Sequence, residues 1–231
     1  MQARSIEQVT QESRQFAANE FMPAMMRIDT LPDAERGELA DKFSSLTGLS
    51  RDFIERANFR VDLDRFQKEL LRSERRTTGR LDSRFKGIDR DAAGESPDSD
   101  PSMNAIRPPY TAAFNAYVRG ELGFKTDTEY YILGGGVSSP WNWNVANGYA
   151  DTSIRMKDAM AKNPYMKIFM AQGYYDMATP FLCCRIYRIS DESRPDASNK
   201  YFICLLRSGT YDVHREKVAG QANRRCHGIY Q

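Results

Sequence analysis

The chain has 231 residues, of which 41% are hydrophobic and 28% are charged, and its formal net charge is +2. Such a hydrophobic fraction supports a sizeable core and excludes an intrinsically disordered protein. Acidic and basic residues are mixed along the chain, so neither nucleic acid nor an anionic membrane is expected as a partner. Because no apolar stretch approaches the ~20 residues of a membrane span and the first residues lack a signal-peptide core, we expect a soluble chain without an export signal.

The first 76 residues carry apolar side chains at helical spacing, with a capping or breaking residue at each boundary. Charged residues on the other faces are expected to face solvent. This pattern indicates a helical insertion rather than a βαβ unit. The predicted helices run from Ser5 to Met22, where Pro23 should kink or end the helix, over Asp33–Ser45 between Pro32 and Gly48, over Arg51–Asn58 after the cap Ser50, and over Leu63–Arg75 after the cap Asp62.

The middle of the chain is less regular. Residues 77–88 are predicted to be extended, and residues 89–109, which are rich in Asp, Ser, Pro and Gly, are predicted to form a long loop. A helix is predicted over Pro109–Leu122, and a short strand over Tyr130–Leu133. Two tryptophans and two asparagines then form a polar-aromatic patch, which could pack under a cap or line a substrate pocket: Trp141, Asn142, Trp143 and Asn144.

Ser96 is the residue of this loop that invites a nucleophile interpretation, because Gly94 stands two residues before it. The nucleophile elbow Gly-x-Ser-x-Gly also needs a glycine two residues after the serine, and Asp98 stands there instead. No predicted strand precedes Ser96 and no predicted helix follows it directly. We therefore do not expect Ser96 to be catalytic.

Residues 151–181 have the pattern of an α/β unit. Asp151 is predicted to cap a helix through Ala161, and Asn163-Pro164 to turn the chain. The apolar run Ile168–Ala171 then has the length of a buried parallel strand, after which Gly173 permits a sharp turn.

Asp176 follows this predicted strand at its carboxyl end, where an α/β sheet places its chemistry. A lone acid there is a candidate third member of a Ser-His-Asp arrangement, in which it orients the histidine. The alternative is that Asp176 only caps the following helix, which Pro180 can open.

The stretch Gly173-Tyr-Tyr-Asp-Met-Ala-Thr-Pro180 resembles the acid segment of the serine carboxypeptidase family, in its bacterial branch. The family pattern there is Gly-x-x-Asp followed by a short apolar run and Pro, and Asp176 occupies the position of the catalytic aspartate. The match covers roughly residues 10–181, the latter half of such enzymes. Further segments that resemble the family are Leu46–Ser50, Glu69–Arg72, Gly79–Phe85, Pro109–Phe114 and Ala161–Pro164.

This resemblance implies a chain of the α/β class, with a partial α/β-hydrolase fold (the C-terminal part of the core) and a helical cap or insertion. Residues 1–110 would form the cap or insertion region and residues 111–181 the core part. The implied activity is that of a serine-type carboxypeptidase, which hydrolyses a peptide substrate from its C-terminus and needs no metal or organic cofactor. Asp176 would hold the catalytic histidine in the correct tautomer. Family members are usually exported.

The chain departs from the family at both ends. No Gly-x-Ser-x-Gly occurs in it, and because the triad order on this fold is Ser, Asp, His, we expect the nucleophile to precede residue 1 and the chain to be inactive as written. After Phe181 the family's histidine segment is missing. All cysteines and histidines of the chain lie in this last part: Cys183, Cys184, Cys204, Cys226, His214 and His227.

A shift of reading frame near codon 181 accounts for the second departure. The codons from Leu205 to Asn223, read one base later, permit a segment that begins Tyr-Tyr-Glu-Ala-Gly-His-Met-Met-Tyr, in which the histidine arises across Thr210 and Tyr211. We therefore expect residues 182–231 to be an out-of-frame, poorly ordered tail. Its written histidines are then incidental, and its cysteines have no spacing typical of zinc ligands or of a disulfide framework.

Two alternatives remain at this point. The chain could be a non-catalytic helical interaction module, or a degenerate remnant, with residues 4–76 as the binding part. It could also derive from an acyltransferase or lyase related to the carboxypeptidases.

Overall fold

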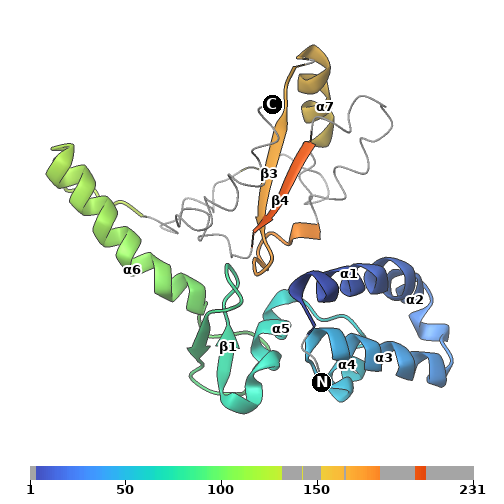
Figure 1. Ribbon diagram of the computed structural model, residues 1–231. Helices are drawn as coiled ribbons and strands as arrows, with labels where there is room; N and C mark the ends of the chain where they lie inside the picture. Colours follow the sequence, from blue (N-terminus) through green and yellow to red (C-terminus); the bar gives the residue numbers. More distant parts are fainter. Residues whose placement is uncertain (1–3, 132–141, 143–151, 164, 183–200, 207–231) are drawn as a thin grey trace. The chain divides into compact units, whose positions relative to one another are not determined.

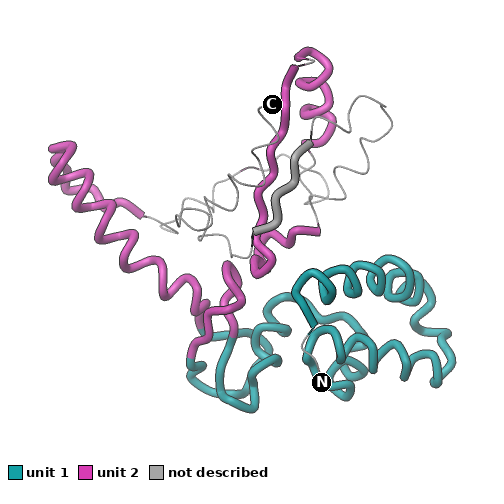
Figure 2. Tube along the Cα trace, viewed as in Figure 1, with its two compact units in different colours: residues 1–77, 88–98 teal, residues 78–87, 99–231 magenta. Residues whose placement is uncertain are grey.

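The computed structural model describes residues 4–131, 142, 152–163 and 165–182, and the backbone of the strand at residues 201–206. The chain forms two compact units (Figure 2). Unit 1 comprises residues 1–77 and 88–98, and unit 2 comprises residues 78–87 and 99–231.

Unit 1 contains the helices that the sequence predicts for the first part of the chain, although the last of them ends at Leu70 instead of Arg75 (Figure 1). Ser50 and Asp62 cap their helices as predicted, because their side chains accept hydrogen bonds from N–H groups of the first turn. The helical elements are α1 (Ile6–Phe16), the π-helical turn η1 (Ala17–Phe21), α2 (Met22–Met25), the 3₁₀ turn η2 (Ile28–Thr30), α3 (Asp33–Thr47), α4 (Arg51–Arg56), α5 (Leu63–Leu70) and the 3₁₀ turn η3 (Arg72–Glu74).

The first helix confirms its predicted cap but not its predicted end. Ser5 Oγ accepts the N–H of Gln8 at 3.2 Å, and the Gln8 side chain accepts the N–H of Ser5 at 2.8 Å, which completes a capping box. The sequence predicts that Pro23 kinks or ends this helix, and Pro23 does not end it, because the chain stays helical to Met25. The π-helical turn η1 places Pro23 in the first turn of α2, where a proline without an N–H is tolerated.

The ends of the next two helices are set by left-handed residues. Gly48 adopts φ 80° directly after α3, and its N–H donates to the carbonyl of Ser44 at 2.8 Å, which confirms Gly48 as the predicted stop. The helix itself extends to Thr47, two residues beyond its predicted end. The helix α4 ends at Arg56, two residues earlier than predicted. Asn58 and Phe59, which follow it, have φ values of 49° and 62°.

The core of unit 1 lies between these helices. Phe16, Phe21 and Phe43 form an aromatic cluster with ring centroids 5.2–6.2 Å apart. The buried apolar residues of this core are Phe16, Ala24, Ile28, Leu39, Ala40, Leu49, Ile54 and Phe59.

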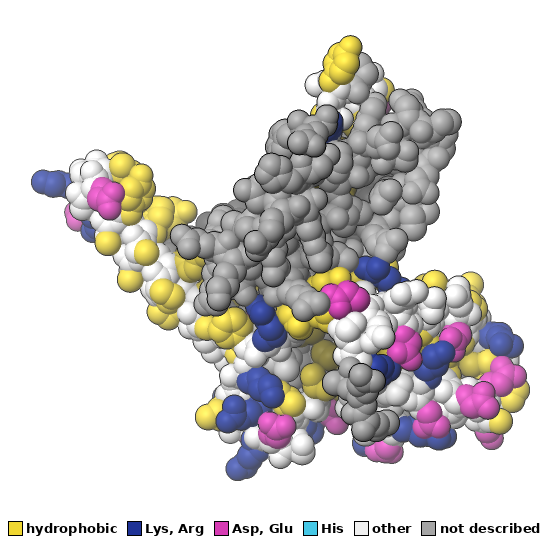
Figure 3. Space-filling view, in the orientation of Figure 1, with side chains coloured by type: hydrophobic (Ala, Val, Ile, Leu, Met, Phe, Trp, Pro, Cys, Tyr) yellow, Lys and Arg dark blue, Asp and Glu magenta, His cyan; other side chains and the backbone are white. Residues whose placement is uncertain are grey.

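Charged side chains cover the outer faces of the helices of unit 1, as the sequence predicts. Figure 3 shows Lys and Arg beside Asp and Glu over this surface. Arg51, for example, lies 3.1 Å from Asp41 and 2.9 Å from Glu55. Such exposed pairs contribute little to stability individually, so unit 1 depends on its apolar core and on its helix caps.

Replacing Ser50 by Ala should lower the free energy of unfolding by about 1 kcal/mol, because the N–H of Phe53 loses its acceptor at 3.2 Å. Urea denaturation of the 231-residue chain measures this. Ser45→Ala is the matched control, since the Ser45 hydroxyl is exposed and bonds only a helix carbonyl. Equal losses in the two variants would contradict the capping role.

The segment after β2 contains the clearest error of the sequence analysis. β1 (Arg76–Thr78) and β2 (Lys86–Ile88) form a two-stranded sheet, which confirms the predicted extended segment at its two ends, whereas residues 79–85 between them form a turn. The following loop is shorter than predicted, because α6 (Pro101–Ala116) begins at Pro101 instead of Pro109. Asp100 caps this helix through Ser102 and Met103, and Pro101 takes its first position.

The remaining elements of unit 2 are the π-helical turn η4 (Tyr117–Glu121), α7 (Ser153–Lys162), β3 (Ile168–Gly173) and β4 (Tyr201–Leu206). Tyr130 and Tyr131, predicted to begin a strand, have no regular structure. The cap position of α7 is Thr152, and the predicted cap Asp151 lies outside the described residues. The same holds for Trp141, Trp143 and Asn144 of the predicted aromatic patch.

The strand β3 confirms the predicted strand and its parallel pairing. It pairs with β4 from Ile168 opposite Tyr201 to Gly173 opposite Leu206. Complete burial is not confirmed, because Phe169 is 49% exposed and only the last two residues of the strand are buried. β4 lies within residues 182–231, the predicted out-of-frame tail, whose other residues apart from Leu182 lie outside the described part of the chain.

Candidate functional site

Asp176 lies in a short loop that leaves β3, and we call residues 174–179 the acid loop. The half-buried Asp176 donates its N–H to the carbonyl of Gly173 at 3.4 Å. Its Oδ1 accepts the N–H groups of Ala178 and Thr179, both at 2.9 Å. Two hydrogen bonds to one carboxylate oxygen hold the plane of this group in one orientation.

These hydrogen bonds bear on the alternative interpretation of Asp176 as a helix cap. The helical residues begin at Phe181, after Pro180. Ala178 and Thr179, which bond Asp176, therefore belong to the loop before those residues. Asp176 closes its own loop.

The acid loop follows the carboxyl end of a parallel strand. Because Gly173 lies opposite Leu206, the carboxyl ends of β3 and β4 meet at the same edge of the sheet. Asp176 follows Gly173 by three residues, so it stands where open α/β sheets place their ligands.

A second segment, far away in the sequence, contacts the acid loop through the backbone. We call it the bracing turn, residues Gly79–Phe85 between β1 and β2. The N–H of Ser83 donates to the carbonyl of Tyr175 at 2.9 Å. The carbonyl of Arg80 accepts the N–H groups of Met177 and Ala178 at 3.0 and 3.2 Å. The backbone on both sides of Asp176 is thereby attached to this turn.

Side chains of the bracing turn add a further contact. The Arg84 guanidinium lies over the Tyr175 ring, with its central carbon 4.7 Å from the ring centroid. Arg84 Nε also donates to both carboxylate oxygens of Asp82, at 2.9 and 3.2 Å. Asp82 is only 3% exposed, so its charge is buried and paired.

The bracing turn is itself fixed by the start of α6. Ser102 Oγ accepts the N–H of Leu81 at 3.0 Å, and Asp100 Oδ1 accepts the N–H of Arg80 at 3.1 Å. A Cβ atom on Gly79 would lie 2.5 Å from the carbonyl oxygen of Asp82 and 2.7 Å from Ser102 Cβ. The turn can therefore close only with glycine at position 79.

Sequence reasoning missed this contact between the bracing turn and the acid loop. The available signal was the expectation from the sequence that both segments, Gly79–Phe85 and Gly173–Pro180, belong to one family-like pattern. The hydrogen bonds between them use backbone N–H and C=O groups, which nearly every residue type carries, so the sequence does not reveal them. Ser96, by contrast, lies in the irregular segment between β2 and α6, as predicted.

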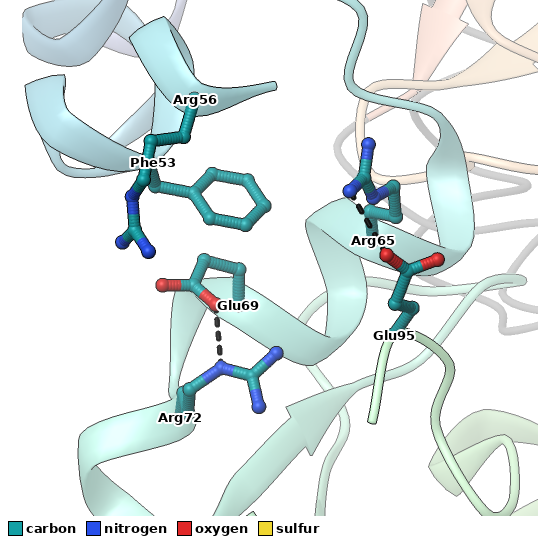
Figure 4. A pocket seen from close by; sticks show the side chains of 6 residues that line it. All are labelled: Phe53, Arg56, Arg65, Glu69, Arg72 and Glu95. Atoms are coloured by element: carbon teal, nitrogen blue, oxygen red, sulfur yellow. Dashed lines mark hydrogen bonds and ion pairs between the residues drawn. The ribbon is translucent and has the colours of Figure 1, made fainter. Parts of the chain in front are cut away.

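Unit 1 has a separate pocket of about 330 Å³ (Figure 4). Its arginines already have acidic partners: Arg65 lies 3.0 Å from Glu95, and Arg72 pairs with Glu69. Arg56, which also lines the pocket, lies 2.6 Å from Asp52. The arginines of this pocket are therefore already paired, and we assign no chemistry to it.

Within the part of the chain that the structure describes, no group of three or more His, Cys, Asp or Glu side chains could hold a metal ion. No helix among those residues is long and apolar enough to cross a membrane. Comparisons of the chain with protein-family models, with curated proteins and with solved structures find no match.

Proposed function

We propose that this chain is the C-terminal part of a serine-type carboxypeptidase of α/β-hydrolase fold, and that Asp176 is the acid of its Ser-His-Asp triad. The observation that carries the proposal is the position of Asp176. This residue occupies the aspartate position of the family-like segment, follows the carboxyl end of a parallel strand, and has its carboxylate held by two backbone N–H groups.

The proposed reaction is hydrolysis of the last peptide bond of a peptide substrate. A serine attacks the carbonyl carbon, while a histidine takes the proton of the hydroxyl and passes it to the leaving amine. Asp176 accepts a hydrogen bond from the imidazole Nδ1–H, which selects the tautomer with a basic Nε2 and stabilises the imidazolium. A carboxylate that its loop holds in one orientation suits this role, since little reorganisation is then needed during the reaction.

The histidine of the proposed triad is expected from the alternative reading frame, which also replaces the written residues that form β4, so the pairing of β3 with β4 does not itself support its position. Parallel neighbours end at the same edge, and β4 ends at Leu206. In the alternative reading frame the histidine codon spans Thr210 and Tyr211, shortly after this end.

Resequencing the gene, from well upstream of codon 1 through codon 231, tests the proposal directly. We expect an upstream frame with a nucleophile-elbow serine, and a one-base correction near codon 181 that restores Tyr-Glu-Ala-Gly-His. A confirmed written frame with no coding sequence upstream would contradict the carboxypeptidase assignment.

The second candidate is a non-catalytic helical interaction module formed by unit 1. The buried apolar core and the capped helices of that unit favour it. Gel filtration of the purified 231-residue chain distinguishes the two proposals. A monodisperse chain favours the module, whereas self-association through unit 2, with unit 1 still folded, favours a fragment whose sheet edges lack partners.

A further inference from the structure

We propose that the bracing turn Gly79–Phe85 is the device that positions Asp176, and that Arg84 and Tyr175 are positioning residues for the triad acid. This inference rests on the proposed triad role of Asp176. It adds a function to a segment that contributes no group to the reaction itself.

The first part of the device is the backbone connection. Tyr175 and Met177, the neighbours of Asp176 in the chain, are both hydrogen-bonded to the turn, through Ser83 N–H and the Arg80 carbonyl. The N–H of Ala178 is shared between that carbonyl, at 3.2 Å, and Asp176 Oδ1, at 2.9 Å. A shift of the turn therefore moves one of the two N–H groups that hold the carboxylate.

The second part is the stacked side chains. Arg84 connects the buried Asp82 carboxylate to the face of the Tyr175 ring. A guanidinium can form its planar pair with a carboxylate and stack on an aromatic ring at the same time, which an ammonium cannot do. Because Tyr175 precedes Asp176 directly, a ring fixed by Arg84 limits the rotation of the backbone that carries the acid.

The third part is the attachment of the turn to a helix. Ser102 and Asp100, at the start of α6, accept N–H groups of the turn, and Ser102 is only 1% exposed. A continuous series of contacts thus connects a helix N-terminus, through the turn, to the acid loop. Rigid support of this kind is what holds a functional group within the narrow tolerance that catalysis needs.

Hydrogen exchange of the amides of Ala178 and Thr179, measured by NMR on the 231-residue chain, tests the positioning without any enzyme activity. Tyr175→Leu removes the ring, and Arg84→Lys keeps the charge but loses the planar fork. We expect both variants to exchange these two amides at least about tenfold faster than the parent chain, because their hydrogen bonds to Asp176 open more often.

Two variants serve as matched controls for this measurement. Tyr175→Phe keeps the ring under Arg84, and Arg155→Lys changes an exposed arginine on α7. Both should leave the exchange at Ala178 and Thr179 unchanged. If Tyr175→Leu and Arg84→Lys also leave it unchanged, the positioning role is overturned.

A second measurement, on the complete enzyme with its reading frame restored, separates this inference from the proposed function. Arg84→Lys should lower kcat on a peptide substrate about 10–100-fold while KM changes less than about twofold, since a misplaced acid affects the chemistry rather than binding. A rise in KM with an unchanged kcat would overturn the inference. Full activity of Asp176→Asn would instead overturn the triad role, whatever the exchange rates of the acid loop show.

Discussion

Replacing Asp176 by Asn in the complete, frame-restored enzyme is expected to lower kcat by about 10⁴-fold. Asparagine has nearly the shape of aspartate, and its Oδ1 can still accept the N–H groups of Ala178 and Thr179. Its NH₂ group then faces the imidazole. An imidazole that accepts this hydrogen bond at Nδ1 carries its proton on Nε2, so it cannot take the proton of the serine.

The measurement is kcat on a peptide with a free C-terminal carboxylate near neutral pH, together with a circular dichroism spectrum of each variant. Asp158→Asn is the matched control, because Asp158 is an exposed aspartate on α7, in the same unit. It should retain the parent rate. A loss below about tenfold for Asp176→Asn, with an intact fold, would remove this residue from the triad.

Local chemistry explains which parts of the fold could be predicted. The caps Ser5, Ser50 and Asp62 act on N–H groups within three residues of themselves, so their pattern is visible in the sequence. Gly48 likewise satisfies a local need, because a left-handed residue ends α3. The strand β3 was predictable from its apolar run and its following glycine.

The errors arose where two local signals compete. The Asp100-Pro101 pair is a helix start, but it stands inside a stretch whose composition is typical of loops. Pro23 is a helix breaker, yet a π-helical turn before it keeps the chain helical. In each case the arrangement of hydrogen bonds decides the outcome, and composition does not reveal it.

The candidate site divides in the same way. The position of Asp176 after a strand was predictable, because it is a feature of the sequence itself, and its role in a triad stays a proposal. Its support by Arg80 and Ser83 was not, because these contacts join segments about ninety residues apart through backbone atoms. The buried pair of Lys68 and Asp89 was also missed, since the charges on the helix faces are predicted to be solvated.

That buried pair is the second place where we expect a substitution to have a large effect, here on the free energy of unfolding. Lys68 Nζ lies 2.6 Å from Asp89 Oδ2 and 2.9 Å from the carbonyl of Asp91, and the paired side chains are 2% and 3% exposed. The N–H of Asp98 donates to Asp89 Oδ1 at 3.1 Å. These bonds attach the segment after β2 to α5, so their loss should affect the stability of unit 1 as a whole.

Replacing Lys68 by Met should lower the free energy of unfolding at pH 7 by about 3–5 kcal/mol, because it leaves the Asp89 carboxylate buried without its cation. Urea denaturation of the 231-residue chain measures the loss. Lys42→Met is the control, since Lys42 lies 2.5 Å from Glu20 in an exposed pair and should cost less than about 1 kcal/mol. Similar losses at the two sites would show that burial does not determine the effect.

The pH dependence of this loss follows from the pKa of Asp89. Burial raises this pKa, but the hydrogen bonds from Lys68 and from the Asp98 N–H, with the charge of Lys68, outweigh burial and bring it below its ordinary value of 3.8. The stability that the pair contributes is therefore complete above pH 3.8 and is lost as the pH falls through the lower folded-state pKa.

In Lys68→Met the contribution of the cation is gone and burial should raise the pKa of Asp89. Protonation of Asp89 should therefore stabilise the folded state of this variant as the pH falls. The difference in unfolding free energy between the parent and Lys68→Met should consequently shrink from pH 7 to pH 3, and a constant difference over that range would contradict an ionised, buried Asp89.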